Sequence, residues 1–171
     1  SSSTINLTNS TVANNTAAGT GGGISSAQSH ITLNNSTVSG NKAKRGGGLY
    51  DSSAGGALIK LINSTISGNS ATQSGGAVLF SSAAAELSNT TVTGNSAAVK
   101  GGSLYLRGAA TNVTISNSIV ANSQGATDCF LLSSASITTI GNNWFDDDSC
   151  SGSGQGDPGL DVLADNGGPT L

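Results

Sequence analysis

Apolar and polar residues alternate with a period of two in five short segments spread evenly along the chain. These segments are residues 5–7, 31–33, 59–61, 85–87 and 113–115. Such alternation is typical of a β-strand with one buried face. No segment shows an apolar stripe with the 3.6-residue period of a helix, and glycine interrupts every run long enough to form one. The pattern therefore predicts an all-β chain.

Each alternating segment opens one copy of a repeated phrase. An asparagine comes two residues after the segment, at Asn9, Asn35, Asn63, Asn89 and Asn117. An aliphatic residue follows three places later, at Val12, Val38, Ile66, Val92 and Val120. Both columns advance by 26, 28, 26 and 28 residues. A fixed period of this size is typical of a stacked array in which each repeat buries its apolar face against its neighbours.

A glycine-rich bend followed by an apolar residue supplies a further strand in each repeat, at 22–24, 47–49, 76–78 and 102–104. Three short strands and three turns per repeat predict one triangular coil, with coils stacked about 4.8 Å apart. The predicted fold is a single-stranded right-handed parallel β-helix, or β-solenoid, of about five coils of 26–28 residues with a C-terminal tail. We place the repeats at 1–136 and a capping segment, packed on the last coil, at 137–171.

Three aliphatic columns are expected to fill the interior. They are Ile5, Ile31, Ile59, Ala85 and Val113; Leu7, Leu33, Leu61, Leu87 and Ile115; and Val12, Val38, Ile66, Val92 and Val120. The column from Asn9 to Asn117 is expected to form a ladder of side-chain amides along the axis. A second ladder is expected at Asn15, Asn41, Asn69 and Asn95, broken by Ser123. Asn9, Asn35, Asn63 and Asn89 also form glycosylation sequons, which inward-facing amides would make poor acceptors.

The chain is poor in charged and aromatic residues. Charged residues make up 9% of the chain and aromatic residues 4%, and there is no methionine. The aligned aliphatic columns argue against the disorder that such a composition would otherwise suggest. The chain opens in mid-pattern without a starting methionine, which suggests a processed product or a fragment. No apolar run is long enough to span a membrane, and no signal peptide is present.

The two cysteines, Cys129 and Cys150, both follow the last regular repeat. A disulfide explains them better than a zinc site, because zinc needs four ligands and the chain has one histidine. A disulfide predicts an oxidising, extracellular setting.

The repeats resemble the β-helical passenger repeats of bacterial surface proteins of the polymorphic outer-membrane type. The residues from Asn117 onward are similar to the closing module of bacterial choice-of-anchor Q proteins, with the motifs Asp128-Cys129, Ser149-Cys150, 156–158 and 163–170. In that family the module ends an extracellular β-helix and usually precedes an anchoring segment. The resemblance implies export, a disulfide and a role at the cell surface, and it implies no catalysis.

Charge is unevenly distributed along the chain. All six basic residues precede residue 128, whereas seven of the nine acidic residues lie from 128 onward, so the body carries +4 and the tail −7. With an uncapped first coil, this asymmetry suggests head-to-tail stacking between copies. Candidate assembly residues are Lys42, Lys44, Arg45, Asp157, Asp161 and Asp165. The alternative is that a missing upstream cap covers the first coil.

The sequence gives little support for catalysis, and we assign no catalytic residues. Enzymes on this fold need clustered carboxylates on one face of adjacent coils. The outward row Asn6, Thr32, Lys60, Glu86 and Thr114 instead predicts a surface ion pair between Lys60 and Glu86. His30 is expected to be an exposed strand residue. Asp146, Asp147 and Asp148 could hold Ca²⁺, although the preferred interpretation is that they are solvated acidic side chains. No other metal or cofactor is expected.

Two binding functions are alternatives to a structural role. An outward threonine column at residues 11, 37, 65 and 91 resembles ice-binding solenoids, but threonine also favours strands for its own sake. Carbohydrate binding needs a platform of exposed aromatic side chains, and the aromatic residues are scattered. We expect an extracellular, non-catalytic structural protein. It would be the protomer of a head-to-tail filament or the stalk of a surface adhesin that contacts host or community surfaces, with no nucleic-acid partner.

Overall fold

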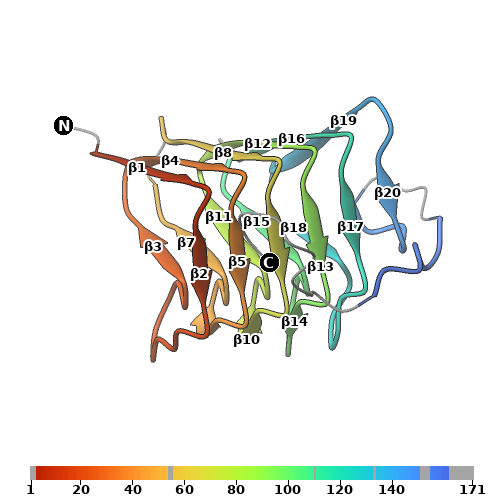
Figure 1. Cartoon of the computed structure of the whole chain (residues 1–171), viewed down its shortest axis with the longest axis horizontal. Coiled ribbons are helices and arrows are strands. Elements are labelled where there is room, and N and C mark those ends of the chain that lie inside the picture. The colour runs from red at the N-terminus through yellow and green to blue at the C-terminus, as the bar shows by residue number, and fades with distance from the viewer. Residues whose placement is uncertain (1–2, 54–55, 110, 133, 151–154, 162–171) are drawn as a thin grey trace.

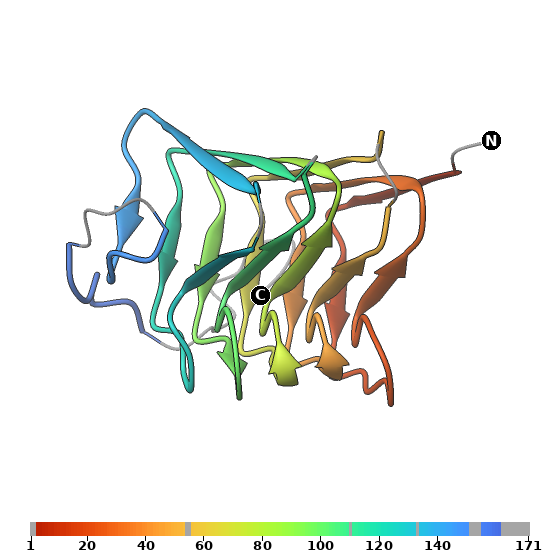
Figure 2. The ribbon, with the colours of Figure 1, turned by 180° about the vertical axis from the view of Figure 1, so that it is seen from behind.

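Four parallel β-sheets wind around one axis in the computed structural model of the chain (Figures 1 and 2). The structure describes residues 3–53, 56–109, 111–132, 134–150 and 155–161. Each coil contributes one strand to several of the sheets, and every strand pairs in parallel with the equivalent strand of the next coil. The all-β solenoid predicted from the repeats is therefore confirmed.

Two six-stranded sheets form most of the wall. Sheet A is built from the alternating segments: β1 (Ser3–Thr8), β4 (Ser29–Asn34), β8 (Leu58–Ile62), β12 (Ala84–Ser88), β16 (Asn112–Ser116) and β19 (Ser136–Ile140). Sheet B carries the aliphatic residue after the asparagine: β2 (Thr11–Ala13), β5 (Thr37–Ser39), β9 (Thr65–Ser67), β13 (Thr91–Thr93), β17 (Ile119–Ala121) and β20 (Trp144–Phe145). Successive strands align without a slip, Ile5 with Ile31 and Val12 with Val38.

Two smaller sheets form the rest of the wall, and the second, third and fourth coils have four strands rather than the predicted three. Sheet C contains β6 (Lys42–Arg45), β10 (Ser70–Ser74) and β14 (Ser96–Ala97). Sheet D follows the glycine bend and contains β3 (Ile24–Ser26), β7 (Leu49–Asp51), β11 (Val78–Ser81), β15 (Leu104–Arg107) and β18 (Cys129–Leu132).

The three predicted aliphatic columns do fill the interior. Their members in the second to fifth coils are buried, whereas Ile5, Leu7 and Val12 of the first coil are half-buried. Sheet D adds Phe80 and Leu106, both fully buried, from the side opposite the predicted columns. Burial of this kind, at about 25 cal/mol per Å² of apolar surface, is the main source of stability.

The first asparagine column does not form the predicted ladder. Asn9, Asn35, Asn63, Asn89 and Asn117 adopt φ angles of 48–50°, the left-handed region that asparagine tolerates better than most residues. Their side chains lie at an exposed turn, and among the described residues only Asn89 Nδ2 and Asn63 Oδ1 join two of these amides, at 3.2 Å. The expectation that these amides face inward is therefore wrong. The argument that the glycosylation sequons are poor acceptors rested on that expectation and no longer holds.

The second asparagine column is the true ladder. Asn41 Nδ2 donates to Asn69 Oδ1 at 3.0 Å, and Asn69 Nδ2 donates to Asn95 Oδ1 at 3.1 Å. The same Oδ1 atoms accept backbone N–H groups of the preceding coil, and the amides also donate to carbonyl oxygens of sheet B, including that of Val38. The three side chains are at most 1% exposed, so their polar groups depend on these bonds.

Sequence reasoning missed a further ladder of hydroxyl groups. In the second to fifth coils the residue after the left-handed asparagine of the first column points inward: Ser36, Ser64, Thr90 and Ser118 are all buried. Ser64 Oγ accepts the N–H of Ser36 at 3.2 Å, and Ser118 Oγ accepts that of Thr90 at 3.0 Å. These hydroxyls thus satisfy the buried backbone at the corner between sheets A and B.

The glycine bend is required by close contact between coils. A Cβ atom at Gly22, Gly47 or Gly76 would lie 2.0–2.4 Å from a carbonyl oxygen of the next coil. The preceding glycines, including Gly46 at φ 60°, provide the left-handed turn.

The solenoid continues beyond residue 136, where the sequence analysis placed the start of the tail. β19 pairs with β16, and β20 pairs with β17, which adds part of a sixth coil. The non-repeating tail therefore starts after Phe145. In Figure 1 it lies at the C-terminal end of the stack, next to β20.

Candidate functional site

The face of the first coil is an open edge of the stack. In the sheet order β1, β2 and β3 are terminal strands of sheets A, B and D, with a paired neighbour on one side only. The apolar columns reach this face through Ile5, Leu7 and Val12, which are half-buried while their partners deeper in the stack are buried. Another coil with the same columns would complete their burial.

The opposite face is closed in part by the tail. The N–H of Gln155 donates to the carbonyl of Phe145 at 2.6 Å, and Trp144 Nε1 donates to the carbonyl of Gly156 at 2.8 Å. The tail therefore lies along the outer edge of β20. Sheet A remains open at β19, where Ile140 is 57% exposed.

A disulfide fixes the tail to the last strand of sheet D. Cys129 and Cys150 are bonded with their Cα atoms 5.0 Å apart, which confirms the predicted pair. Ser149 Oγ accepts the N–H of Cys129 at 2.9 Å, and Asp147 Oδ2 accepts that of Asp128 at 3.0 Å. Tail side chains thus satisfy backbone donors at the start of β18.

Three carboxyl groups meet beside this disulfide. Asp128 is buried, and its Oδ1 atom accepts the N–H of Ser123 at 3.3 Å. Asp146 accepts the N–H of Asn122 and faces the Asp128 carboxyl. Burial raises the pKa of Asp128 to about 8, and the adjacent Asp146 and Asp147 carboxyl groups raise it as well. Sequence analysis grouped Asp146 and Asp147 with Asp148, which is exposed, and did not include Asp128.

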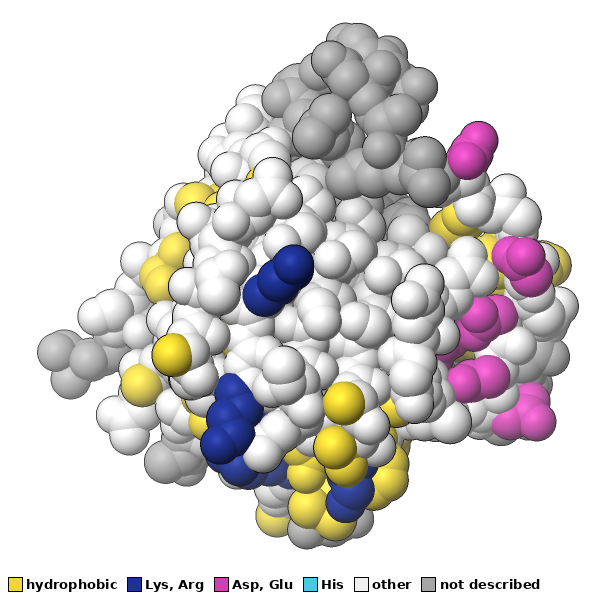
Figure 3. All heavy atoms as spheres, turned by 90° about the horizontal axis from the view of Figure 1, so that it is seen from below, with side chains coloured by type: hydrophobic (Ala, Val, Ile, Leu, Met, Phe, Trp, Pro, Cys, Tyr) yellow, Lys and Arg dark blue, Asp and Glu magenta, His cyan; other side chains and the backbone are white. Residues whose placement is uncertain are grey.

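The predicted assembly residues do not form one surface. Lys42, Lys44 and Arg45 lie exposed on β6, the edge strand of sheet C. Asp157 is exposed in the tail and Asp165 lies outside the described residues. Asp161 borders a groove of about 540 Å³ together with Asn14 of the first coil, so the tail returns alongside the body. Sequence order is therefore not spatial order in the tail, although Asp and Glu side chains do gather toward the C-terminal end in Figure 3.

The comparison with family models gives one match, described as a right handed beta helix region, over residues 1–167. The chain belongs to the right-handed β-helix family. The comparison with curated proteins and the comparison with solved structures each found no match. Family membership establishes the fold and its right-handed winding, and it does not identify a site.

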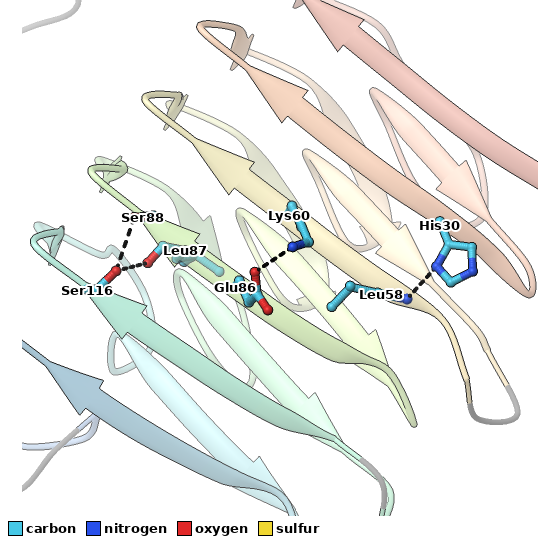
Figure 4. Close-up of polar contacts among 7 residues, drawn as sticks. All are labelled: His30, Leu58, Lys60, Glu86, Leu87, Ser88 and Ser116. Carbon is cyan, nitrogen blue, oxygen red and sulfur yellow. Dashed lines mark hydrogen bonds and ion pairs between the residues drawn. The ribbon is translucent and has the colours of Figure 1, made fainter.

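On sheet A of this right-handed β-helix, the outward row contains one ion pair (Figure 4). Lys60 Nζ lies 3.0 Å from Glu86 Oε2, and both side chains are substantially exposed, so the pair contributes little to stability. His30 is half-buried rather than exposed, and its Nδ1 atom accepts the N–H of Leu58 at 3.1 Å. The imidazole therefore satisfies the first backbone donor of β8.

The outward threonine column of the β-helix is not a uniform exposed strip. Thr11 is exposed, Thr65 and Thr91 are half-buried, and Thr37 is only 1% exposed. A flat ice-binding face needs all of these side chains at the surface. The burial of Thr37 weighs against that function.

A basic groove of about 270 Å³ lies beside sheet C of the β-helix. Arg45, Lys100 and Arg107 line it together with Tyr105. Arg45 Nε donates to Gln73 Oε1 at 2.9 Å, and Lys100 Nζ lies 4.5 Å from the ring centre of Phe130. Arg107 Nε donates to Ser81 Oγ at 3.2 Å, so all three cations are held by neighbouring coils. The described part of the chain contains no helix with the length and apolar character needed to cross a membrane.

Proposed function

We propose that this chain is a non-catalytic structural β-helix of an extracellular protein and forms the closed end of a surface stalk. The observation that carries the proposal is the difference between the two end faces. The first coil presents terminal strands and apolar column ends, whereas a disulfide-linked tail covers the last coil at β18 and β20.

An open first coil suits a face that receives further coils. Terminal strands carry unpaired backbone groups that template pairing, and proteins normally cover or blunt them. Repeat arrays end in atypical capping units for the same reason. The tail has this character, because residues 155–156 lie along β20 and Ser149 and Asp147 accept the first N–H groups at β18.

The disulfide supports the extracellular part of the proposal. Such bonds persist in oxidising compartments and are rare in reducing ones. The non-catalytic part rests on the outward rows of sheet A, where Lys60 and Glu86 neutralise each other at 3.0 Å. Paired in this way, neither group is poised to act as a general acid or base.

A filament protomer is the second candidate, favoured by the half-buried Ile5, Leu7 and Val12. A second copy could supply the coil that covers them. Head-to-tail stacking would have to place this face against the end that the tail partly covers. The return of Leu160 and Asp161 to a groove along the body weakens the axial charge asymmetry that was expected to guide it. We therefore rank it below the stalk.

Adding one coil to either end tests the proposal. One variant carries a second copy of residues 3–28 directly before Ser3, and the control carries the same segment after Leu171. The N-terminal addition is expected to raise the midpoint of thermal unfolding by several degrees, because stability in a solenoid grows with each stacked interface. The control addition is expected to leave the midpoint unchanged.

Equal midpoints for the two variants would contradict the proposal. Light scattering and negative-stain microscopy of the unmodified chain separate the two candidates. The stalk end is expected to be monomeric at high concentration, whereas filaments that disappear when the extra N-terminal coil is present would replace the stalk by the filament protomer.

A further inference from the structure

The acidic residues near the disulfide come from segments that are distant in sequence. Asp128 directly precedes β18, whereas Asp146 and Asp147 directly follow β20. The Cys129–Cys150 bond holds the two segments together. A carboxylate oxygen of Asp128, one of Asp147 and the Cys150 sulfur all lie within 4.8 Å of one another, and the Asp146 carboxyl adjoins that of Asp128. The cluster is therefore built into the closed end of the solenoid and is not a solvated acidic run.

One oxygen in this cluster lacks an N–H or hydroxyl donor. Asp128 is 1% exposed, and its Oδ2 atom is buried with no such donor among the described residues, while the Asp146 carboxyl lies within hydrogen-bonding reach of the Asp128 carboxyl. A buried carboxylate oxygen left in this way is destabilising, because it has lost the hydrogen bonds of water and gained none in exchange. The unsatisfied atom points to a positively charged or proton-donating group at this position.

The neighbours of Asp128 cannot supply that group when they are ionised. The Asp146 carboxyl faces it, and ionised carboxylates only accept hydrogen bonds. Asp147 accepts hydrogen bonds from Ser149 through Oδ1 and from the Asp128 N–H through Oδ2. Among the described residues no Lys, Arg or His side chain forms an ion pair with any of the three. The remaining candidates are a bound cation and a proton shared between two carboxyl groups.

We propose that Asp128, Asp146 and Asp147 bind a calcium ion that fastens the tail to the last coils. An all-oxygen donor set is what hard divalent cations prefer, and calcium accepts irregular geometry with six to eight oxygens, including carbonyl groups and water. Magnesium demands nearly ideal octahedral geometry. The sulfur of Cys150 is bonded to Cys129, so it is no thiolate and cannot make this a zinc site.

This site differs from the acidic run considered in the sequence. Asp148 is exposed and is replaced in the ligand set by the buried Asp128. The ion would bridge the turn at 122–128 to the segment at 146–150, the same two segments that the disulfide joins. The proposal does not depend on the stalk, because a filament protomer would need the same closure of its last coil.

Calcium titration of the chain after EDTA treatment tests the proposal. Isothermal titration calorimetry at pH 7.5 is expected to give one site with a Kd on the order of 10⁻⁴ to 10⁻³ M, the range of extracellular calcium modules. Calcium at 5 mM is expected to raise the thermal midpoint by several degrees, and magnesium at the same concentration by clearly less. Asp128→Asn and, separately, Asp146→Asn should weaken binding at least tenfold.

The control variant is Asp157→Asn, in which an exposed tail carboxylate that accepts the Gly159 N–H is neutralised. It should bind calcium as the unmodified chain does. Two results would overturn the proposal. The first is that the unmodified chain shows no calcium response and Asp128→Asn is as stable in EDTA as the parent, which would assign the cluster to a shared proton. The second is a calcium response that Asp157→Asn removes. Asp146→Asn keeps the test decisive if Asp128→Asn does not fold.

Discussion

In the first coil Ile5, Leu7 and Val12 are half-buried and three sheets end without a further strand, whereas at the other end a tail covers β18 and β20. The first face is made of the same repeated columns as the interior. The last face is partly closed by residues that occur once: a disulfide, the aspartates beside it and a tryptophan. Repetition thus builds the length of the solenoid, and its closure requires sequence outside the repeat.

The middle coils and the first coil should therefore respond very differently to the same substitution. Ile66 is fully buried in the column of sheet B, and Val12 is its half-buried counterpart in the first coil. Ile66→Asp buries a charge without a partner and should cost more than about 4 kcal/mol of unfolding free energy, enough to unfold a marginally stable chain. Val12→Asp should cost roughly 1–2 kcal/mol, because its carboxylate reaches water.

Urea unfolding followed by circular dichroism measures both values. Thr65→Asp, at the outward-facing and half-buried position beside Ile66, is the control and should lose clearly less unfolding free energy than Ile66→Asp. Equal losses for Ile66→Asp and Val12→Asp would show that the first coil is as well covered as the middle of the stack.

The aliphatic columns could be predicted because their evidence is local and repeated five times. A period of two within each segment and a spacing of 26 or 28 residues between segments leave one register that buries every aliphatic residue. The asparagines could not be sorted in the same way. Asparagine recurs at the position of Asn63 because the turn there is left-handed, and at the position of Asn69 because its amide belongs to the buried ladder. In the sequence both positions show the same pattern, a column of asparagines.

The closed end was only partly predictable. The disulfide could be predicted from the two cysteines. The adjacent residues Asp146, Asp147 and Asp148 were considered for Ca²⁺, but solvated acids were the preferred interpretation and Asp128 was not included. Asp128 directly precedes Cys129, so the predicted bond already placed it beside the segment that ends at Cys150. The burial of its carboxyl group and the return of the tail alongside the body depend on the tertiary path of the tail, which has no repeat to reveal it.

Removal of the disulfide should affect the closed end and spare the rest of the stack. Replacing Cys129 and Cys150 by alanine opens a loop with a sequence separation of 21, which is worth about 3 kcal/mol in the chain-entropy model. Coils of a solenoid contact only their neighbours, so the loss should stay local. Hydrogen exchange is expected to accelerate at β18 and β20 and to stay unchanged at β9; acceleration throughout the stack would indicate that the closure stabilises every coil.

The smallest expected effect concerns a buried acid inside the repeats. Asp51 lies in the inward column of sheet D between Ser26 and Phe80, and Ser53 donates to it through its N–H at 3.0 Å and its hydroxyl at 2.8 Å. Burial raises the pKa of Asp51 above the usual 3.8, against the opposing effect of the Ser53 hydrogen bonds. The folded state then holds this proton more tightly than the unfolded state, so its stabilising contribution is complete below pH 3.8 and is lost as the pH rises through the folded pKa. Asp51→Asn should remove this loss, so the thermal midpoint of the parent relative to the variant should fall as the pH rises above 3.8. Asp157→Asn, at an exposed position near the closed end, should follow the parent throughout, and a midpoint difference that stays constant or grows with pH would show that Asp51 is ionised in the folded solenoid.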